Sequence, residues 1–313
     1  MVDPPDADFA VALSVAPLEL APRAAFAADL RMRVYRRLGF APPSGVAPMR
    51  RADGLEYEVG GNPDGAAVLL IHAGTATAYA PLMVEPALAD RYRLVRFHRR
   101  GYAGSDGFNG PVTIDAFVRD ALALLEHLGI EQAHVVGHSG SGVVALQLAL
   151  DAPERVHTLV LEEPALAQLD ERWQAAMHHA TAAPRALARA GDAGGAVDMW
   201  MNGIARSWRT DLERTVPGGP QQTIDDAATF MAEVEAVDAW EFDRARTEAM
   251  TMPVLYLIAE GSPHRAAARR FQTHVPHTEI ATILDATHML HTDQPALVAA
   301  ELDAFFARHT ADP

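Results

Sequence analysis

The stretch His134-Val135-Val136-Gly137-His138-Ser139-Gly140-Ser141-Gly142 decides the fold that this 313-residue sequence predicts. The apolar, β-branched residues at its start are typical of a strand. The apolar, glycine-free run from Val143 to Leu150 that follows is typical of a helix. Small residues between the two predict a sharp turn, because they let the strand and the helix approach each other. Ser139 stands at the tip of that turn, so we expect its hydroxyl to be exposed to a substrate.

Residues 137–141 resemble the G-x-S-x-G nucleophile elbow of the α/β-hydrolase superfamily, with Ser141 where the last glycine is usual. That position requires a small side chain more than it requires glycine itself. The resemblance implies that Ser139 is the catalytic nucleophile of a serine hydrolase of the esterase or haloperoxidase-like branch. Ser141 is the weaker candidate, because it lies past the turn in the first residues of the helix. Together with the motifs below, the resemblance covers about residues 49–308, without the segment 164–252.

Composition and charge limit the class of ligand. The chain is 49% hydrophobic and 21% charged, which is typical of a globular protein with a large core. Its formal net charge of -15 argues against nucleic acid and anionic membranes, and favours a small apolar or neutral substrate. With no cysteine there is no disulfide or thiolate. Cytoplasm is therefore the default location. No apolar run approaches the roughly 20 residues of a membrane span, so we expect a soluble protein.

Alternating strand and helix patterns predict the domain organisation. Residues 1–46 form an extension with one amphipathic helix, about residues 22–38, whose arginines suit a partner or lipid surface, an arm on the same domain, or a homodimer contact. Residues 47–163 and 253–313 form the α/β-hydrolase core. Residues 164–252 form a helical cap, inserted after the sixth strand. The expected fold is a mostly parallel eight-stranded sheet with helices on both faces.

Two further loops that follow predicted strands resemble superfamily motifs. His72-Ala73-Gly74-Thr75 resembles the H-G-x-P or H-G-G loop that supplies one N–H of the oxyanion hole. The resemblance implies that the N–H groups of Gly74 and Gly140 hold the oxyanion. Residues 98–106 resemble the D-x-R-G-x-G-x-S loop, with His98 where aspartate is usual, and this loop is mainly structural in the family.

The loop Asp285-Ala286-Thr287-His288 after the last predicted strand, with the helix that follows, resembles the G-x-x-H ending of the superfamily. The resemblance places His288 as the catalytic base, in the chain order serine before histidine. His291, almost one helical turn further on, is a poor second candidate.

The carboxylate that completes the triad departs from the common pattern. In most α/β-hydrolases an aspartate follows the long strand that ends here near Ala259, but that position is occupied by Ser262. Glu163 is the best candidate, because it ends the strand after the elbow helix, where some haloalkane dehalogenases of the superfamily carry their acid. Glu260 is the second candidate. Glu163 as a helix-capping residue is the alternative interpretation.

The predicted cap contains all four tryptophans and several methionines, which predicts an apolar pocket above Ser139. At least half of these side chains should be simple packing residues. The residues that we expect to contact substrate are Trp173, Met177, Trp200, Trp208 and Trp240. His178 and His179 are adjacent on a predicted helix and point about 100° apart, so we expect no metal there, and no cofactor.

Three functions are compatible with these motifs. The first is hydrolysis of an ester, thioester or lactone with an apolar moiety, through a Ser139–His288–Glu163 triad and an acyl-enzyme. The second is a non-hydrolytic enzyme on the same fold, a cyclase, lyase or acyltransferase of a biosynthetic pathway. The third is a ligand-binding protein with a degraded triad. Dehalogenase and epoxide hydrolase chemistry is disfavoured, because in this superfamily it needs an aspartate where Ser139 stands.

Overall fold

The computed structural model describes residues 49–309, and an eight-stranded sheet organises this range. The strand order is β1-β2-β4-β3-β5-β6-β7-β8. β2 is antiparallel to β1 and β4, and the remaining neighbours are parallel, which confirms the expected fold class. The strands are β1 (Arg50–Ala52), β2 (Leu55–Gly61), β3 (Ala67–Ile71), β4 (Arg93–His98), β5 (Ala133–His138), β6 (Val156–Glu162), β7 (Val254–Ala259) and β8 (Thr278–Ile283).

The central strands are apolar along their whole length because both faces of the sheet are covered. In β3, Leu69 and Ile71 pack in the core on one face, and Val68 and Leu70 pack in the core on the other. All four side chains are fully buried. This alternation follows from the two-residue period of a strand. It explains why these segments appear in the sequence as continuous apolar runs.

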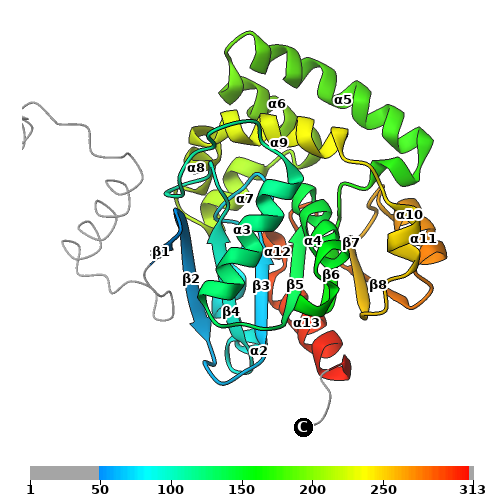
Figure 1. Ribbon diagram of the computed structural model, residues 1–313. Helices are drawn as coiled ribbons and strands as arrows, with labels where there is room; N and C mark the ends of the chain where they lie inside the picture. The colour runs from blue at the N-terminus through cyan, green and yellow to red at the C-terminus, as the bar shows by residue number, and fades with distance from the viewer. Residues whose placement is uncertain (1–48, 310–313) are drawn as a thin grey trace, which may run out of the picture. The chain divides into compact units, whose positions relative to one another are not determined.

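Helices form a layer on each face of the sheet. One face is covered by α3 (Ile114–His127), α4 (Gly140–Asp151) and α11 (Arg265–His274), whose apolar residues share one core with the strands. Helices α3 and α4 lie in front of the strands in Figure 1. The other face is covered by η3 (Pro81–Val84), α2 (Pro86–Ala89) and α13 (Pro295–His309). The short α12 (Leu290–Asp293) precedes α13.

The chain between β6 and β7, which we call the helical insertion (residues 164–252), is mostly helical. Figure 1 shows α5, α6 and α9 at the top of the view, above the strands. Whether the insertion is a separate cap stays a prediction, and the predicted helix at 22–38 lies outside the described residues. No helix among residues 49–309 is long and apolar enough to cross a membrane. The insertion contains η5 (Ala167–Leu169), α5 (Glu171–Arg189), α6 (Ala193–Ile204), α7 (Trp208–Thr215), α8 (Gly219–Asp225), α9 (Ala227–Ala239) and α10 (Arg244–Glu248).

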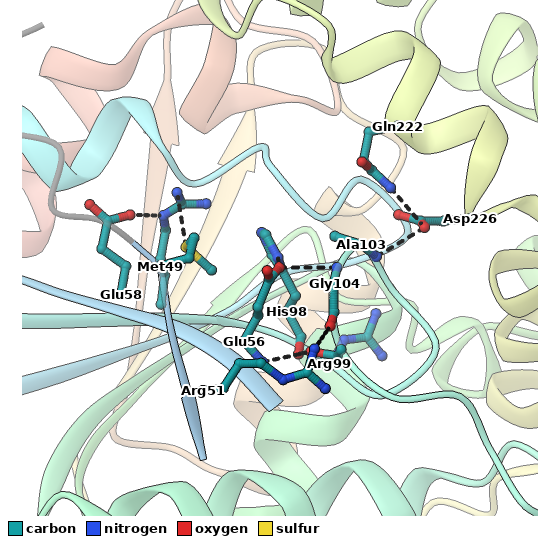
Figure 2. Close-up of polar contacts among 12 residues, drawn as sticks. Met49, Arg51, Glu56, Glu58, His98, Arg99, Ala103, Gly104, Gln222 and Asp226 are labelled. Atoms are coloured by element: carbon teal, nitrogen blue, oxygen red, sulfur yellow. Dashed lines mark hydrogen bonds and ion pairs between the residues drawn. The ribbon is translucent and has the colours of Figure 1, made fainter. Parts of the chain in front are cut away.

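The loop after β4 is held by polar contacts to neighbouring elements (Figure 2). Glu56 Oε2 accepts hydrogen bonds from the Gly104 N–H, at 3.0 Å, and from His98 Nδ1, at 2.9 Å. Both contacts lower the pKa of Glu56, the His98 bond most, so this carboxylate is ionised. His98 therefore ties β4 to β2, as expected of a structural loop.

Asp226 joins this loop to the helical insertion. Its Oδ1 accepts hydrogen bonds from the Ala103 N–H and from Gln222 Nε2, both at 3.0 Å (Figure 2). Its Oδ2 has no partner among the described residues. Burial raises the pKa of Asp226 to about 7, although the bonds from Ala103 and Gln222 act in the opposite direction. The folded protein thus holds this carboxyl protonated where the unfolded chain would ionise it.

Asp226→Asn should raise the free energy of unfolding more at pH 8 than at pH 4. Asp226 is ionised above about pH 3.9 in the unfolded chain, but only above about pH 7 in the fold. Between these values the unfolded state releases its proton first, so wild-type stability falls as pH rises. The asparagine cannot ionise, and its advantage should grow by about 2–4 kcal/mol across that window.

Urea unfolding at pH 4, 6 and 8 measures this difference. Asp115→Asn is the control, because Asp115 is an exposed aspartate on α3. A difference between Asp226→Asn and wild type that stays constant with pH would contradict the assignment.

Candidate active site

The turn between β5 and α4 holds Ser139 in a strained conformation. Its backbone has φ 50° and ψ -121°, and a non-glycine residue in such a region costs about 1–3 kcal/mol. The surrounding backbone holds it there. The Ser139 N–H donates to Glu162 O, and Ser139 O accepts from Gly142 N–H and Ala165 N–H, each at 2.9 Å. Strain maintained by several hydrogen bonds is typical of a functional position.

Ser139, His288 and Glu163 form a continuous hydrogen-bonded chain. His288 Nε2 lies 3.0 Å from Ser139 Oγ, and His288 Nδ1 lies 2.9 Å from Glu163 Oε2. An ionised Glu163 only accepts, so Nδ1 carries the proton and Nε2 is left to accept from the Ser139 hydroxyl. A hydroxyl, an imidazole and a carboxylate are thereby aligned in the order that acyl transfer requires.

Glu163 is buried, and its environment keeps it charged. Its side chain is 2% exposed, and Oε1 accepts a hydrogen bond from the Ala259 N–H at 2.8 Å. Burial alone would raise the pKa of Glu163, but the hydrogen bond with His288 and the adjacent His264 lower it to about 2. Its backbone φ of 42° is also in the left-handed region. The carboxylate is therefore fixed and ionised beside the imidazole.

The other carboxylates considered for this role lie elsewhere. Glu260 is exposed, and its N–H donates to Ile283 O, with no contact to His288. Glu162 faces away from Glu163: its Oε2 accepts from Tyr79 Oη at 2.7 Å and lies 3.1 Å from His291 Nδ1. His291 is therefore placed against Glu162 and not against Ser139.

Helix α9 covers both glycines predicted for the oxyanion hole, which line one cavity together with Ser139. A methyl group built on Gly74 would lie 2.4 Å from the Phe230 ring, and one built on Gly140 would lie 2.8 Å from Glu233 Oε1. A side chain at Gly74 would overlap the Phe230 ring, and one at Gly140 would require the Glu233 carboxylate to shift. Gly140 is also the first residue of α4, so its N–H has no partner within the helix.

Ser141, which replaces the last glycine of the elbow motif, links the elbow to the loop of Gly74. Its hydroxyl donates a hydrogen bond to His72 O. The His72 ring in turn accepts from the Arg99 N–H through Nε2, at 2.9 Å. The substitution thus provides a connection that glycine could not make, and only the assembled fold reveals it.

The cavity above Ser139 has an apolar wall supplied mainly by the helical insertion. Of the five residues predicted to contact substrate, Met177 and Trp200 line it. Further lining residues from α6 and α9 are Met201, Ile204, Phe230, Val234 and Val237.

Trp173, Trp208 and Trp240 are not among the residues that line this cavity, so substrate contact by these three stays a prediction. The Trp173 ring packs edge-on against His264, with 4.4 Å between ring centroids. Trp208 is 2% exposed and borders a second cavity beside α7. Trp240 Nε1 donates to Gln147 Oε1 at 2.8 Å. Each indole packs against, or donates a hydrogen bond to, residues that are distant in the sequence. The helical spacing of the tryptophans does not predict these contacts.

Two histidines that the sequence did not single out for the site support His288. His138 Nε2 donates to His288 O at 2.8 Å and holds the loop of the base. The His264 ring stacks on the His288 ring, with centroids 5.5 Å apart and planes at 23°. Burial lowers the pKa of His264 to about 4, so it is neutral at neutral pH. Their roles come from contacts between distant segments, for which the sequence carries no signal.

One grouping among residues 49–309 has the donor set of a metal site. Ligand atoms of Glu163, His264 and His288 lie within 4.8 Å of one another. Two of the three belong to the hydrogen-bonded chain with Ser139, so an ion there would compete with it. His178 lies elsewhere, with Nε2 3.2 Å from Asp238 Oδ1. That the protein needs no metal or cofactor stays a prediction.

Comparison with known sequences identifies related hydrolases. The profile described as "alpha/beta hydrolase fold" matches residues 66–295. A Caulobacter sp. (strain K31) protein named "Putative carbamate hydrolase RutD" is 40% identical over 114 residues, which are 35% of this chain and 42% of that protein. The Bacillus subtilis (strain 168) protein "Uncharacterized hydrolase YraK" is 33% identical over 117 residues, 37% of this chain and 42% of that protein. The chain thus spans about two fifths of these relatives.

Solved structures share the fold over most of the chain. The enol-lactonase from Burkholderia xenovorans LB400 has a TM-score of 0.67 at 19% identity, covering 83% of this chain and 100% of the other. A thermophilic esterase from Thermogutta terrifontis has a TM-score of 0.68 at 20% identity, covering 86% and 100%. The bromoperoxidase from Bacillus anthracis has a TM-score of 0.66 at 21% identity, covering 83% and 96%. At these identities the likeness concerns the fold alone.

Gly74→Ala should lower the free energy of unfolding by about 1–3 kcal/mol, because the added methyl overlaps the Phe230 ring. In the double variant Gly74→Ala/Phe230→Ala the overlap is gone, so the two costs should not add. Gly203→Ala is the control, since its methyl would meet open space. Urea unfolding of wild type, Gly74→Ala, Phe230→Ala and the double variant measures the coupling. Strictly additive costs would place Phe230 away from Gly74.

Proposed function

Because this chain belongs to the alpha/beta hydrolase fold family, we propose that it is a serine hydrolase of carboxylic esters, thioesters or lactones. One observation carries the proposal. The Ser139 hydroxyl, both nitrogens of His288 and the Glu163 carboxylate are joined by contacts of 3.0 and 2.9 Å beside a cavity. A ligand receptor with a degraded triad would need no such alignment, so the geometry favours an enzyme.

In the proposed acylation step, Ser139 Oγ attacks the substrate carbonyl carbon and His288 Nε2 takes the hydroxyl proton. Glu163 holds the proton-bearing Nδ1 and stabilises the imidazolium that forms. His288 then gives the proton to the leaving group, which is the oxygen of an alcohol or the sulfur of a thiol. The acyl-enzyme remains. In the second step His288 activates a water that releases the acid and regenerates Ser139.

The proposed oxyanion hole lies where α9 meets the elbow. The N–H groups of Gly74 and Gly140 would donate to the oxygen of the tetrahedral intermediate. They are fixed before the reaction by the Ser141–His72 hydrogen bond and by the start of α4. Such preorganised donors stabilise the charge that develops without having to reorganise.

The cavity supports a neutral substrate with an apolar part. Met177, Trp200 and the apolar side chains of α6 and α9 form most of its wall. Charged residues in the wall are paired with opposite charges: Arg185 Nη2 lies 3.1 Å from Asp238 Oδ2, and Glu233 is paired with Arg99. The relative named "Putative carbamate hydrolase RutD" supports a carbonyl substrate of related chemistry. We propose that the helical insertion acts as the cap that encloses this substrate.

Ser139→Ala should abolish hydrolysis of a short-chain aryl ester while leaving the unfolding transition in place. His288→Ala should have the same effect, because within residues 49–309 the hydrogen bond to Ser139 Oγ comes from His288 Nε2. His291→Ala should keep most of the activity, since His291 is placed against Glu162. Ester hydrolysis followed by absorbance, with circular dichroism melting as the folding check, tests the set. Turnover by folded Ser139→Ala would exclude the mechanism.

Glu163→Gln should lower kcat by about 10³–10⁴, because the amide keeps the shape but removes the charge and favours the wrong imidazole tautomer. Glu260→Gln is the matched control and should stay within a few-fold of wild type, since Glu260 is exposed. Steady-state kinetics of the two variants decides between the acids. A severe loss in Glu260→Gln and a mild one in Glu163→Gln would reverse the assignment.

A further inference from the structure

One buried carboxylate outside the triad, Glu233, belongs to the cavity wall and has an oxygen without a hydrogen-bond partner within residues 49–309. Glu233, on α9, is 3% exposed and lines the cavity together with Ser139. Its Oε2 accepts hydrogen bonds from Arg99 Nη2, at 2.7 Å, and from Tyr102 Oη. Its Oε1 is buried and has no partner among the described residues. An ionic oxygen left without a donor is costly, so a donor on a ligand would be stabilising there.

This free oxygen lies beside the proposed oxyanion hole. A methyl group built on Gly140 would lie 2.8 Å from Glu233 Oε1, so the glycine lets this oxygen approach the start of α4. An acyl group bound to Ser139, with its carbonyl oxygen toward the N–H groups of Gly74 and Gly140, would extend along the cavity wall that includes Glu233. Glu233 Oε1 is therefore placed to contact the acyl group of the substrate.

The charges around Glu233 favour a neutral donor over a cation. Arg99 is fully buried and forms an ion pair with Glu233, so the pair carries no net charge. The second ion pair in the wall, Arg185 with Asp238, is also balanced. A hydroxyl or an amide N–H can satisfy Oε1 without adding an unpaired buried charge.

A second acceptor without a partner lies in the same wall. Gln168 Nε2 donates to Val237 O at 3.4 Å and to Trp240 O at 3.2 Å, which directs Oε1 away from these carbonyls. Gln168 Oε1 is buried and has no partner within residues 49–309. Arg185 Nε is a buried donor in the same wall, and it has no hydrogen-bond partner in the described part of the chain. Two free acceptors near α9 indicate a ligand that brings hydrogen-bond donors to this side.

We propose that Glu233 is a specificity-determining residue that accepts a hydrogen bond from a hydroxyl or N–H on the carbon next to the reacting carbonyl. The inference rests on the proposed serine hydrolase function and narrows its substrate class. The preferred substrates are esters or lactones of acids with a neutral hydrogen-bond donor at position 2 and an apolar remainder. Glu233 takes no part in bond making, so its contribution is binding energy that acts on kcat/KM.

Four phenyl esters test this inference: the butyrate, the 2-hydroxybutyrate, the 2-methoxybutyrate and the 2-acetamidobutyrate. The methoxy ester has an oxygen at the same position but cannot donate, and the last ester distinguishes an N–H from a hydroxyl. Wild type should hydrolyse at least one donor ester with a kcat/KM about ten- to one-hundredfold above that of the methoxy ester. In Glu233→Gln this ratio should fall by about tenfold or more, because the acceptor loses its charge.

Glu235→Gln is the matched control, because Glu235 lies on the same helix, is exposed and pairs only with Arg189 in the described chain. It should keep the wild-type ratio. If Glu233→Gln leaves Arg99 unpaired and does not fold, Arg99→Met/Glu233→Gln removes both buried charges and takes its place. A general structural defect would lower all four rates alike, whereas the inference requires a change in their ratio.

The possible outcomes separate this inference from the proposed function. If the butyrate is hydrolysed by a Ser139-dependent reaction but wild type shows no preference for a donor ester, the inference is wrong and the function stands. The same conclusion follows if the preference persists in folded Glu233→Gln. If no ester of the series is hydrolysed and Ser139 does not react with a fluorophosphonate, the function itself fails and the inference fails with it.

Discussion

The hydrogen bond between Glu163 and His288 is the constraint on which the rest of the site depends. The carboxylate comes from the end of β6 and reaches across to β7, where the Ala259 N–H fixes its other oxygen at 2.8 Å. A carboxylate buried to this degree stays ionised because its neighbours donate hydrogen bonds to it. The position after β7, where the resemblance to the superfamily implies an aspartate, is occupied by Ser262. The carboxylate therefore follows β6 here, and β7 supplies a backbone N–H that binds it.

The second constraint is the fit between the helical insertion and the elbow. Phe230 and Glu233 are three residues apart on α9, so they lie on one helical face and approach Gly74 and Gly140. Below them, the Ser141 hydroxyl ties the elbow to the loop of Gly74. The geometry of the proposed oxyanion hole therefore depends on contacts from both sides, and Asp226 links the same helix to the loop after β4.

The sequence predicts the fold well, because buried parallel strands leave continuous apolar runs and the elbow leaves a cluster of small residues between strand and helix. The chain order and the strand ends also predict that Glu163 and His288 meet near Ser139, although their catalytic roles stay predictions. Contacts between distant segments leave no such pattern. His138, His264 and Glu233 act through neighbours far away in the sequence, and Trp173, Trp208 and Trp240 face other partners than helical spacing suggests.

The central claim is that this arrangement activates Ser139 as a nucleophile. Mass spectrometry of the intact protein and its peptides after reaction with a fluorophosphonate tests it most directly, because the probe needs both an activated serine and an oxyanion hole. The account predicts the addition of one phosphonyl group, located on the peptide that contains Ser139. A folded protein that gains no phosphonyl group, or gains it at another residue, would contradict the account.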